Sequence, residues 1–186
     1  MNGFEYRRDM LGELERTLMA VDDNAVEHVI GLIMGAERIF FTGAGRAGLM
    51  LRGMAMRLMH MGYCCHVVGD VTTPSIQKND LLIVASGKAE TKTSSYFVDV
   101  AKAVGAQVLV LTANPEGSVA RKADDKLVLT APQFRGDPDP ERCSVQPMGN
   151  RFEQSVLLVG DYIVKLIKER RNLDIQVMYR NHATLE

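Results

Sequence analysis

The sequence lacks any apolar run that approaches the roughly 20 residues of a membrane-spanning helix. Its first residues also lack the apolar core of a signal peptide, because Glu5, Arg7, Arg8 and Asp9 bring charges in early. We therefore expect a cytoplasmic protein that makes no contact with a membrane.

An excess of either charge is also missing. The chain carries 22 basic and 23 acidic residues, interspersed, for a net charge of -1. Its densest basic run, from Lys168 to Arg171, contains Glu169 and falls at the end of a predicted helix, where cations are favourable in any protein. We therefore expect no nucleic-acid partner.

Cysteine is scarce as well. Cys64, Cys65 and Cys143 are odd in number, and no metal-ligand spacing connects them to the four histidines. We expect reduced thiols and no metal site.

A length of 186 residues with 46% hydrophobic side chains is enough for one domain with a sizeable core. Short apolar runs predict strands, and these alternate with segments of helical periodicity. The predicted strands cover residues 39–42, 65–68, 81–85, 107–112 and 126–129. The predicted helices cover residues 4–20, 24–35, 49–61, 92–104 and 150–170, with a short one ending near Ala120. Right-handed crossovers between parallel strands then give an α/β fold in three layers.

We divide this single domain, 1–186, into N-terminal helices at 4–35, a sheet core at 36–170 and a tail at 171–186. The first helix should pack outside the sheet through an apolar face made of Phe4, Leu11, Leu14, Leu18 and Met19. Residues 131–149 hold four of the six prolines and should form a long irregular loop, and the tail from Asp174 should be irregular too.

The predicted helix 49–61 is apolar nearly all round and rich in methionine. Such a helix is covered on more than one side. The sheet covers one side, so a subunit contact on the other is one interpretation, and a single deep intramolecular core is the alternative.

The sharpest change of character lies between Asp80 and Thr93. The buried strand Leu81 to Ala85 stops at Ser86-Gly87, and a helical pattern begins at Lys92. The turn from Ser86 to Thr91 thus joins the carboxyl end of a strand to a helix N-terminus, where N–H groups and the helix dipole favour an anion. Ser86, Thr91 and Thr93 add hydroxyl groups and Lys88 adds a positive charge. We interpret it as a phosphate cradle; the alternative is an ordinary turn in which Thr91 caps the helix.

A second glycine-rich turn, from Gly43 to Gly48, superficially matches the dinucleotide pattern Gly-x-Gly-x-x-Gly. Asp70, about where a ribose-binding acid would fall, lies in a Gly-Asp-Val-Thr-Thr-Pro loop and not at a clear strand end. The dinucleotide interpretation is therefore disfavoured.

Taken together, several segments resemble the SIS (sugar isomerase) domain, and within it the 6-phospho-3-hexuloisomerase family. The stretches that carry the resemblance cover nearly the whole chain in order. They are Gly43-Ala44-Gly45-Arg46, Ala55 to His60, Ser86 to Thr91, Thr112 to Pro115, Gln146-Pro147-Met148-Gly149, Phe152-Glu153-Gln154 and His182-Ala183-Thr184-Leu185-Glu186.

The resemblance implies a flavodoxin-like sheet in the order 2-1-3-4-5, a homotetramer, and no metal or cofactor. It also implies interconversion of 3-hexulose 6-phosphate and fructose 6-phosphate in the ribulose monophosphate pathway of formaldehyde assimilation. The small-molecule partner would be a sugar phosphate, and hexulose phosphate synthase would be a possible functional partner.

Two departures from the family pattern fall in the cradle. The family usually has Ser-Gly-Ser-Gly-Glu-Thr where this chain has Ser86-Gly87-Lys88-Ala89-Glu90-Thr91, and a serine at the position of Ala47. Two hydroxyl groups are lost and one ammonium is gained. If Lys88 points inward, it replaces hydrogen bonds with Coulomb attraction to the phosphate. Ala89 stands where glycine would allow a positive φ.

Moving a carbonyl between two carbons of a sugar needs a base that carries a proton between them. We expect Glu153, in the first turn of the helix 150–170, to be that base; the alternative is an acid that only complements the helix dipole. His182 is the candidate for moving protons among the oxygens, and the resemblance implies that the tail reaches a neighbouring subunit's site. Arg46 and Glu90 are candidates for holding sugar oxygens; the alternatives are a salt-bridged turn residue for Arg46 and a capping acid for Glu90. Gly45 is a candidate for the far side of the phosphate site.

Two other functions remain open from the sequence. A non-catalytic SIS protein that senses a sugar phosphate would need only the cradle and no base. An isomerase of another sugar phosphate would need both the cradle and a base. A transcription regulator would also need a DNA-binding headpiece, and residues 1–35 hold two helices without a basic face.

Overall fold

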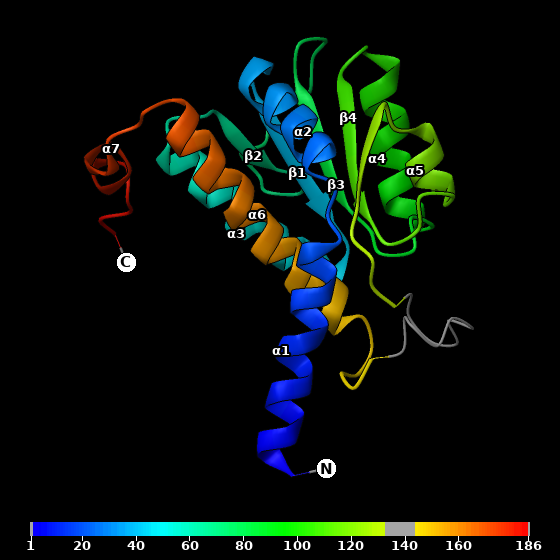
Figure 1. Ribbon diagram of the computed structural model, residues 1–186. Helices are drawn as coiled ribbons and strands as arrows, with labels where there is room; N and C mark the ends of the chain where they lie inside the picture. The colour runs from blue at the N-terminus through cyan, green and yellow to red at the C-terminus, as the bar shows by residue number, and fades with distance from the viewer. Residues whose placement is uncertain (1, 133–143, 186) are drawn as a thin grey trace.

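The computed structural model of the protein describes residues 2–132 and 144–185. Five parallel strands form one sheet in the order β2-β1-β3-β4-β5 (Figure 1). They are β1 (Ile39–Gly43), β2 (Cys65–Val67), β3 (Leu81–Ala85), β4 (Gln107–Thr112) and β5 (Asp125–Val128). The predicted three-layer α/β fold and its strand order are confirmed, and β5 begins one residue earlier than predicted.

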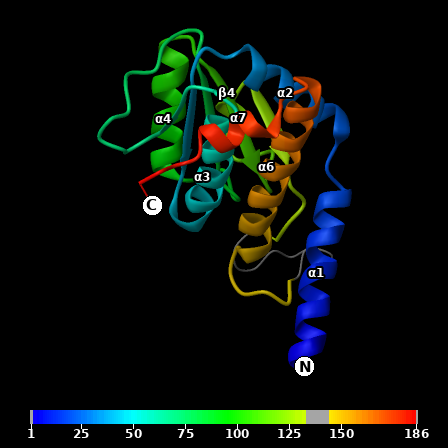
Figure 2. The ribbon, with the colours of Figure 1, turned by 90° about the vertical axis from the view of Figure 1, so that its left-hand side faces the viewer.

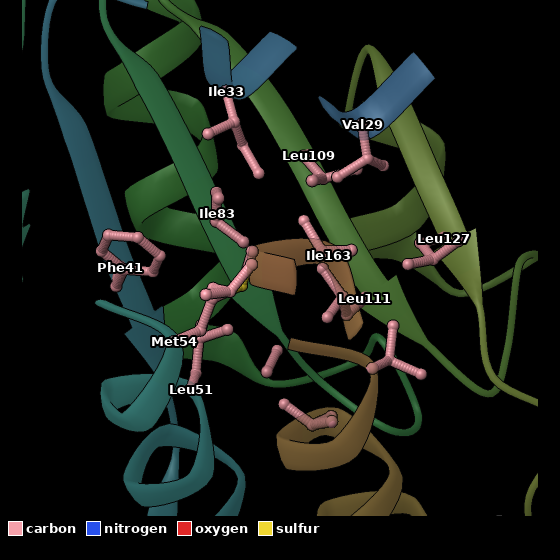
Figure 3. Packing of buried hydrophobic residues seen from close by; sticks show 14 of the residues in the cluster. Val29, Ile33, Phe41, Leu51, Met54, Ile83, Leu109, Leu111, Leu127 and Ile163 are labelled. Carbon is pink, nitrogen blue, oxygen red and sulfur yellow. The ribbon is translucent and has the colours of Figure 1, made fainter. Parts of the chain in front are cut away.

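Helices cover both faces of this sheet, because the strands are apolar on both sides. The helices α2 (Asp23–Gly35), α3 (Gly45–His60) and α6 (Asn150–Arg170) pack on one face. The opposite face is covered by α4 (Lys92–Ala103) and α5 (Ser118–Lys122). Successive side chains of a strand point to opposite faces, so Phe41 joins the first cluster while Phe40 joins the second. Figure 3 shows the first cluster.

The long helix α6 lies alongside α3 over much of its length (Figures 1 and 2). Its predicted apolar stripe is buried: no member exposes more than 3% of its surface. The stripe consists of Phe152, Val156, Val159, Ile163 and Ile167. The two helices approach closely where Gly160 meets Met54, since a Cβ on Gly160 would lie 3.1 Å from the Met54 Cβ. This contact brings the middles of the two helices together, and hydrogen bonds from Arg46 to Asn150 and Glu153 join their first turns.

Helix α1 (Gly3–Met19) differs from its prediction. It projects away from the sheet, with the N-terminus at its far end (Figures 1 and 2). Phe4, Leu11 and Met19 are exposed, whereas Glu13 and Thr17 are buried. The predicted apolar face is therefore wrong for these three residues. The reason is tertiary: α1 packs against α6, and the contact buries polar side chains.

The tail also differs from its prediction, because it contains the short helix α7 (Ile175–Arg180). The Asp174 side chain caps this helix by accepting a hydrogen bond from the Gln176 amide at 2.9 Å. Asn181 then donates from Nδ2 to the His60 carbonyl at 3.0 Å, which attaches the tail to the end of α3. Six residues are too few to display a helical period in the sequence.

The predicted Pro-rich loop lies partly outside the described residues, as does Cys143. Its described flanks, 130–132 and 144–149, contain neither helix nor strand. Within 2–132 and 144–185, no helix is both long and apolar enough to cross a membrane.

Candidate active site

A cavity of about 320 Å³ opens beyond the carboxyl ends of β1 and β3. The chain leaves these two neighbouring strands toward opposite faces of the sheet, which is the switch point where α/β proteins bind ligands. The residues that line it come from three turns and the start of α6. They are Ala44, Ala47, Ala85, Ser86, Gly87, Lys88, Thr91, Pro132, Met148, Gly149, Phe152 and Glu153.

One wall is the turn between β3 and α4. Ser86 Oγ lies 3.3 Å from Thr91 Oγ1, so the two hydroxyl groups face each other across the turn. Thr91 occupies the N-cap position of α4, but its side chain makes no capping hydrogen bond. Thr91 is thus the N-cap residue by position, but its hydroxyl group does not cap the helix, and Ser86 and Thr91 both line the cavity.

The backbone of this turn is held from its outer side. Three consecutive carbonyls, those of Gly87, Lys88 and Ala89, accept hydrogen bonds from the connection between β4 and α5. The donors are Ala113 N at 3.0 Å, Asn114 Nδ2 at 3.1 Å and Val119 N at 2.8 Å. Because N–H and C=O point in opposite directions across a trans peptide, the amides of residues 88 and 90 point away from that connection. The turn thus presents amide donors on its inner side.

Two of the residues that depart from the family pattern, Lys88 and Ala89, lie in this turn, whereas the third, Ala47, lines the cavity from the first turn of α3. Ala89 is fully buried and adopts a φ of 52°, the left-handed conformation that a glycine adopts without strain. Lys88 is exposed and lines the cavity. Lys88, which stands where the family usually has a serine, is therefore one of the residues that line the cavity.

The opposite wall carries the carboxylate. Glu153 lies in the first turn of α6, and its side chain is 20% exposed. Arg46, from the first turn of α3, donates from Nη1 to Glu153 Oε2 at 2.7 Å and to Asn150 Oδ1 at 3.0 Å. Arg46 therefore fixes one oxygen of the carboxylate. Asn150 was not anticipated from the sequence, although it stands only three residues before Glu153.

The glycine-rich turn between β1 and α3 is explained by close packing. A Cβ on Gly48 would lie 2.2 Å from the Gly43 carbonyl oxygen, so the first turn of α3 can rest on the strand end only without side chains there. Gly45 has a φ of 59°. It lines a smaller neighbouring cavity of about 160 Å³, together with Arg52, and does not line the larger one.

Glu90 is not brought into the cavity. Its carboxylate accepts hydrogen bonds from Ser118 N at 2.7 Å and Ser118 Oγ at 2.5 Å. These bonds lower the pKa of Glu90 below its usual value. The side chain therefore ties the turn to the start of α5, and a role in holding sugar oxygens finds no support in this geometry.

His182 is also remote from the cavity of its own chain. Its ring stacks on that of His60 with 5.1 Å between centroids, and His60 is the last residue of α3. The cavity lies at the first turn of α3, and a helix of 16 residues is about 24 Å long. His182 could therefore act only in the cavity of another subunit.

The apolar part of the lining was not assigned to the site from the sequence. Phe152 packs beneath the cradle, where a Cβ on Gly87 would lie 3.2 Å from its ring. Met148 and Gly149 complete the wall that leads into α6. All three residues belong to stretches that carry the family resemblance, which is the signal that could have identified them.

Comparison with known proteins agrees with this architecture. The family model described as "SIS domain" matches residues 32–134, which include β1 to β5 and both glycine-containing turns. A structure of a protein from Methanococcus jannaschii, whose molecular function was inferred to be that of a 3-hexulose-6-phosphate isomerase, superimposes with a TM-score of 0.83. The two chains are 29% identical, and the match covers 100% of each.

Several curated relatives carry the name 3-hexulose-6-phosphate isomerase, among them proteins from Bacillus subtilis and Mycobacterium gastri. The protein from Bacillus subtilis is 37% identical over 190 residues, which covers 100% of both chains. The protein from Mycobacterium gastri is 36% identical over 174 residues, covering 94% of this chain and 86% of its own. The similarity extends beyond the SIS segment into α6 and the tail.

Proposed function

Because the chain belongs to the SIS domain family, we propose that it is a 6-phospho-3-hexuloisomerase, which interconverts D-arabino-hex-3-ulose 6-phosphate and D-fructose 6-phosphate. One observation carries the proposal. A single cavity at the switch point has an anion cradle on one wall and the Glu153 carboxylate on the other. The name shared by the two full-length relatives supports the choice of substrate.

The cradle binds the phosphate group. A phosphate monoester carries a charge of about -1.5 to -2 at neutral pH. The inner amides of the turn, the hydroxyl groups of Ser86 and Thr91, the N-terminus of α4 and the charge of Lys88 all favour an anion there. Phosphate binding at this end directs the sugar carbons toward the wall that carries Glu153.

Glu153 is the base. It takes the proton from C2 of the 3-ulose, which leaves a 2,3-enediol, and returns a proton to C3 as the carbonyl forms at C2. Meanwhile the oxygen at C3 gains a proton and the oxygen at C2 loses one. Arg46 holds one carboxylate oxygen of Glu153 at 2.7 Å, which leaves the other oxygen to face the carbon. The charge of Arg46 also favours the developing enediolate.

His182 of a second subunit is the candidate for moving the proton between the two oxygens or for opening the sugar ring. This role requires an oligomer, and we propose a homotetramer. Helix α3 buries Leu51, Met54 and Leu58 against its own chain but leaves Leu49, Met56 and Met59 exposed. That second apolar face supports a subunit contact.

The same proposal places the enzyme in the cytoplasm, in the ribulose monophosphate pathway, where it would take its substrate from hexulose phosphate synthase. No metal or cofactor is needed for a proton transfer of this kind.

The test is to supply 3-hexulose 6-phosphate and to follow fructose 6-phosphate through a coupled reaction. An isomerase forms fructose 6-phosphate in proportion to its concentration. A sensing protein would bind fructose 6-phosphate, as measured by calorimetry, without turning over either sugar. An isomerase of another sugar phosphate would leave both hexuloses unchanged and convert a different substrate.

A further inference from the structure

A buried carboxylate on α1 has no role in the mechanism above. Glu13 is only 3% exposed, although its helix projects from the rest of the chain. Its side chain accepts three hydrogen bonds from one short segment before α6. The donors are Ser144 Oγ at 2.7 Å, Val145 N at 2.7 Å and Gln146 Nε2 at 3.2 Å. A buried carboxylate needs such partners, so the segment and Glu13 hold each other in place.

Thr17 lies one turn further along the same face of α1. It is fully buried, and its Oγ1 donates to the Thr130 carbonyl at 2.9 Å. The same oxygen accepts a hydrogen bond from Arg151 Nε at 2.7 Å. Burial lowers the pKa of Arg151, and the negative charge of Glu13 acts in the opposite direction. Together, Glu13 and Thr17 form what we name the α1 clamp.

The α1 clamp holds two segments that continue directly into the cavity walls. Thr130 stands two residues before Pro132, and residues 144–146 stand just before Met148. Met148 has a φ of 60°, a left-handed conformation that is unfavourable for a residue with a side chain. Such a conformation persists only where the surrounding structure enforces it. The hydrogen bonds to Glu13 hold the chain up to Gln146, two residues before Met148.

We propose that Glu13 and Thr17 are positioning residues for the isomerase, and that α1 sets the cavity wall and the first turn of α6 from which Glu153 projects. This inference rests on the proposed function for its kinetic readout. Neither side chain lines the cavity. They act through the segments before and within α6, and the phosphate cradle on the opposite wall does not depend on them.

The experiment compares Glu13→Ala with Glu13→Gln and with the control Glu15→Ala, an exposed acid on the same helix. Glu13→Ala removes all three acceptor contacts. Glu13→Gln keeps an acceptor for the Val145 amide and gains a donor for Ser144 Oγ. Turnover and KM are measured below the unfolding temperature of each variant, and amide hydrogen exchange is followed in the peptide 144–153.

We expect Glu13→Ala to lower kcat about 10- to 100-fold, because a displacement of about 1 Å in a reacting group has effects of this size. KM should change less than about 3-fold, since the cradle is intact. The peptide 144–153 should exchange faster, Glu13→Gln should recover part of the loss, and Glu15→Ala should match the wild type. A role in stability alone would lower the unfolding temperature and leave kcat unchanged.

An unchanged kcat in folded Glu13→Ala, or unchanged exchange in 144–153, overturns the inference. If Glu13→Ala does not fold, Ser144→Ala removes one of the three contacts with Glu13 and should lower kcat about 2- to 5-fold, less than the loss of all three. No change in Ser144→Ala would overturn the inference equally. A wild type without turnover defeats the proposed function instead, while hydrogen exchange still tests the α1 clamp.

Discussion

We propose that Lys88 alters the phosphate site without removing it. The turn from Ser86 to Thr91 keeps its amides and two hydroxyl groups facing the cavity, while an exposed ammonium takes the place of a hydroxyl. An exposed charge attracts a phosphate less strongly than a buried one, because water and salt screen it. Lys88 should therefore contribute to affinity and less to turnover.

Lys88→Ala should weaken substrate binding by about 1 kcal/mol, which is roughly a 5-fold rise in KM, with kcat nearly unchanged. The effect should shrink as the salt concentration rises, since the contact is screened. Steady-state kinetics at low and high salt measure the rise in KM and its dependence on salt. Lys78→Ala, before the amino end of β3, is the matched control and should behave like the wild type. A KM unaffected by Lys88→Ala would mean that the ammonium does not reach the phosphate, and Ser86→Ala should then have the larger effect.

Among single residues, the sequence identified those whose place at the cavity follows from their neighbours in the chain. Ser86, Lys88 and Thr91 line the cavity because a buried strand, a turn and a helix follow one another in the sequence. Glu153 does so because it falls in the first turn of a long helix. Glu90 lies in the same turn but binds Ser118, 28 residues away, and no local pattern indicates such a partner.

Among the elements, the turn from Ser86 to Thr91 depends on the connection that follows β4. Ala89 and Lys88 rest against Gly117: a Cβ there would lie 2.5 Å from the Lys88 carbonyl oxygen and 2.6 Å from the Ala89 Cβ. Neither neighbour is the end of a flexible side chain. The space that Gly117 leaves empty therefore sets the shape of the cradle.

Gly117→Ala should destabilise the protein by about 1 to 3 kcal/mol, the usual cost of overpacking, and should also raise KM because the cradle must shift. Urea unfolding and steady-state kinetics measure the two effects. Gly31→Ala is the control, since nothing lies within 4 Å of its Cβ on the exposed side of α2. That substitution should stabilise the protein by about 0.5 to 1 kcal/mol. If Gly117→Ala leaves both stability and KM unchanged, the contact with the cradle is not tight.

Which elements could be predicted follows from how each is stabilised. Helix α6 buries a regular apolar stripe, so periodicity found it to the residue. Helix α1 was found, but the burial of Glu13 and Thr17 was not, because both side chains form hydrogen bonds with residues more than 100 positions away. Helix α7 was missed because a helix of six residues depends on its cap and on contact with α3.

At the scale of the whole molecule, the position of the tail bears on whether the active site is shared between subunits. Residues 181 and 182 are attached to the last residue of α3, at the end of the helix remote from the cavity. A catalytic role for His182 therefore implies a site shared between subunits. One chain cannot reveal such a site from its sequence, since the contact joins residues of different copies.

Light scattering at micromolar concentration should give the mass of a tetramer; a monomer would contradict the subunit contact on α3.

Mixing inactive Glu153→Gln subunits with His182→Ala subunits should restore some activity, because mixed oligomers contain sites with one intact copy of each residue. Each variant, taken through the same exchange alone, provides the control. No recovery after verified exchange of subunits would place both residues in sites made by one chain.

The central claim is that Glu153 carries the proton between the two carbons, and Glu153→Gln tests it most directly. The substitution keeps the shape of the side chain and removes the base. Measured with 3-hexulose 6-phosphate, kcat should fall roughly 100- to 10,000-fold, the usual contribution of a general base. The affinity for fructose 6-phosphate, measured by calorimetry, should remain close to that of the wild type because the cradle is on the other wall. A Glu153→Gln protein with full turnover would contradict the account.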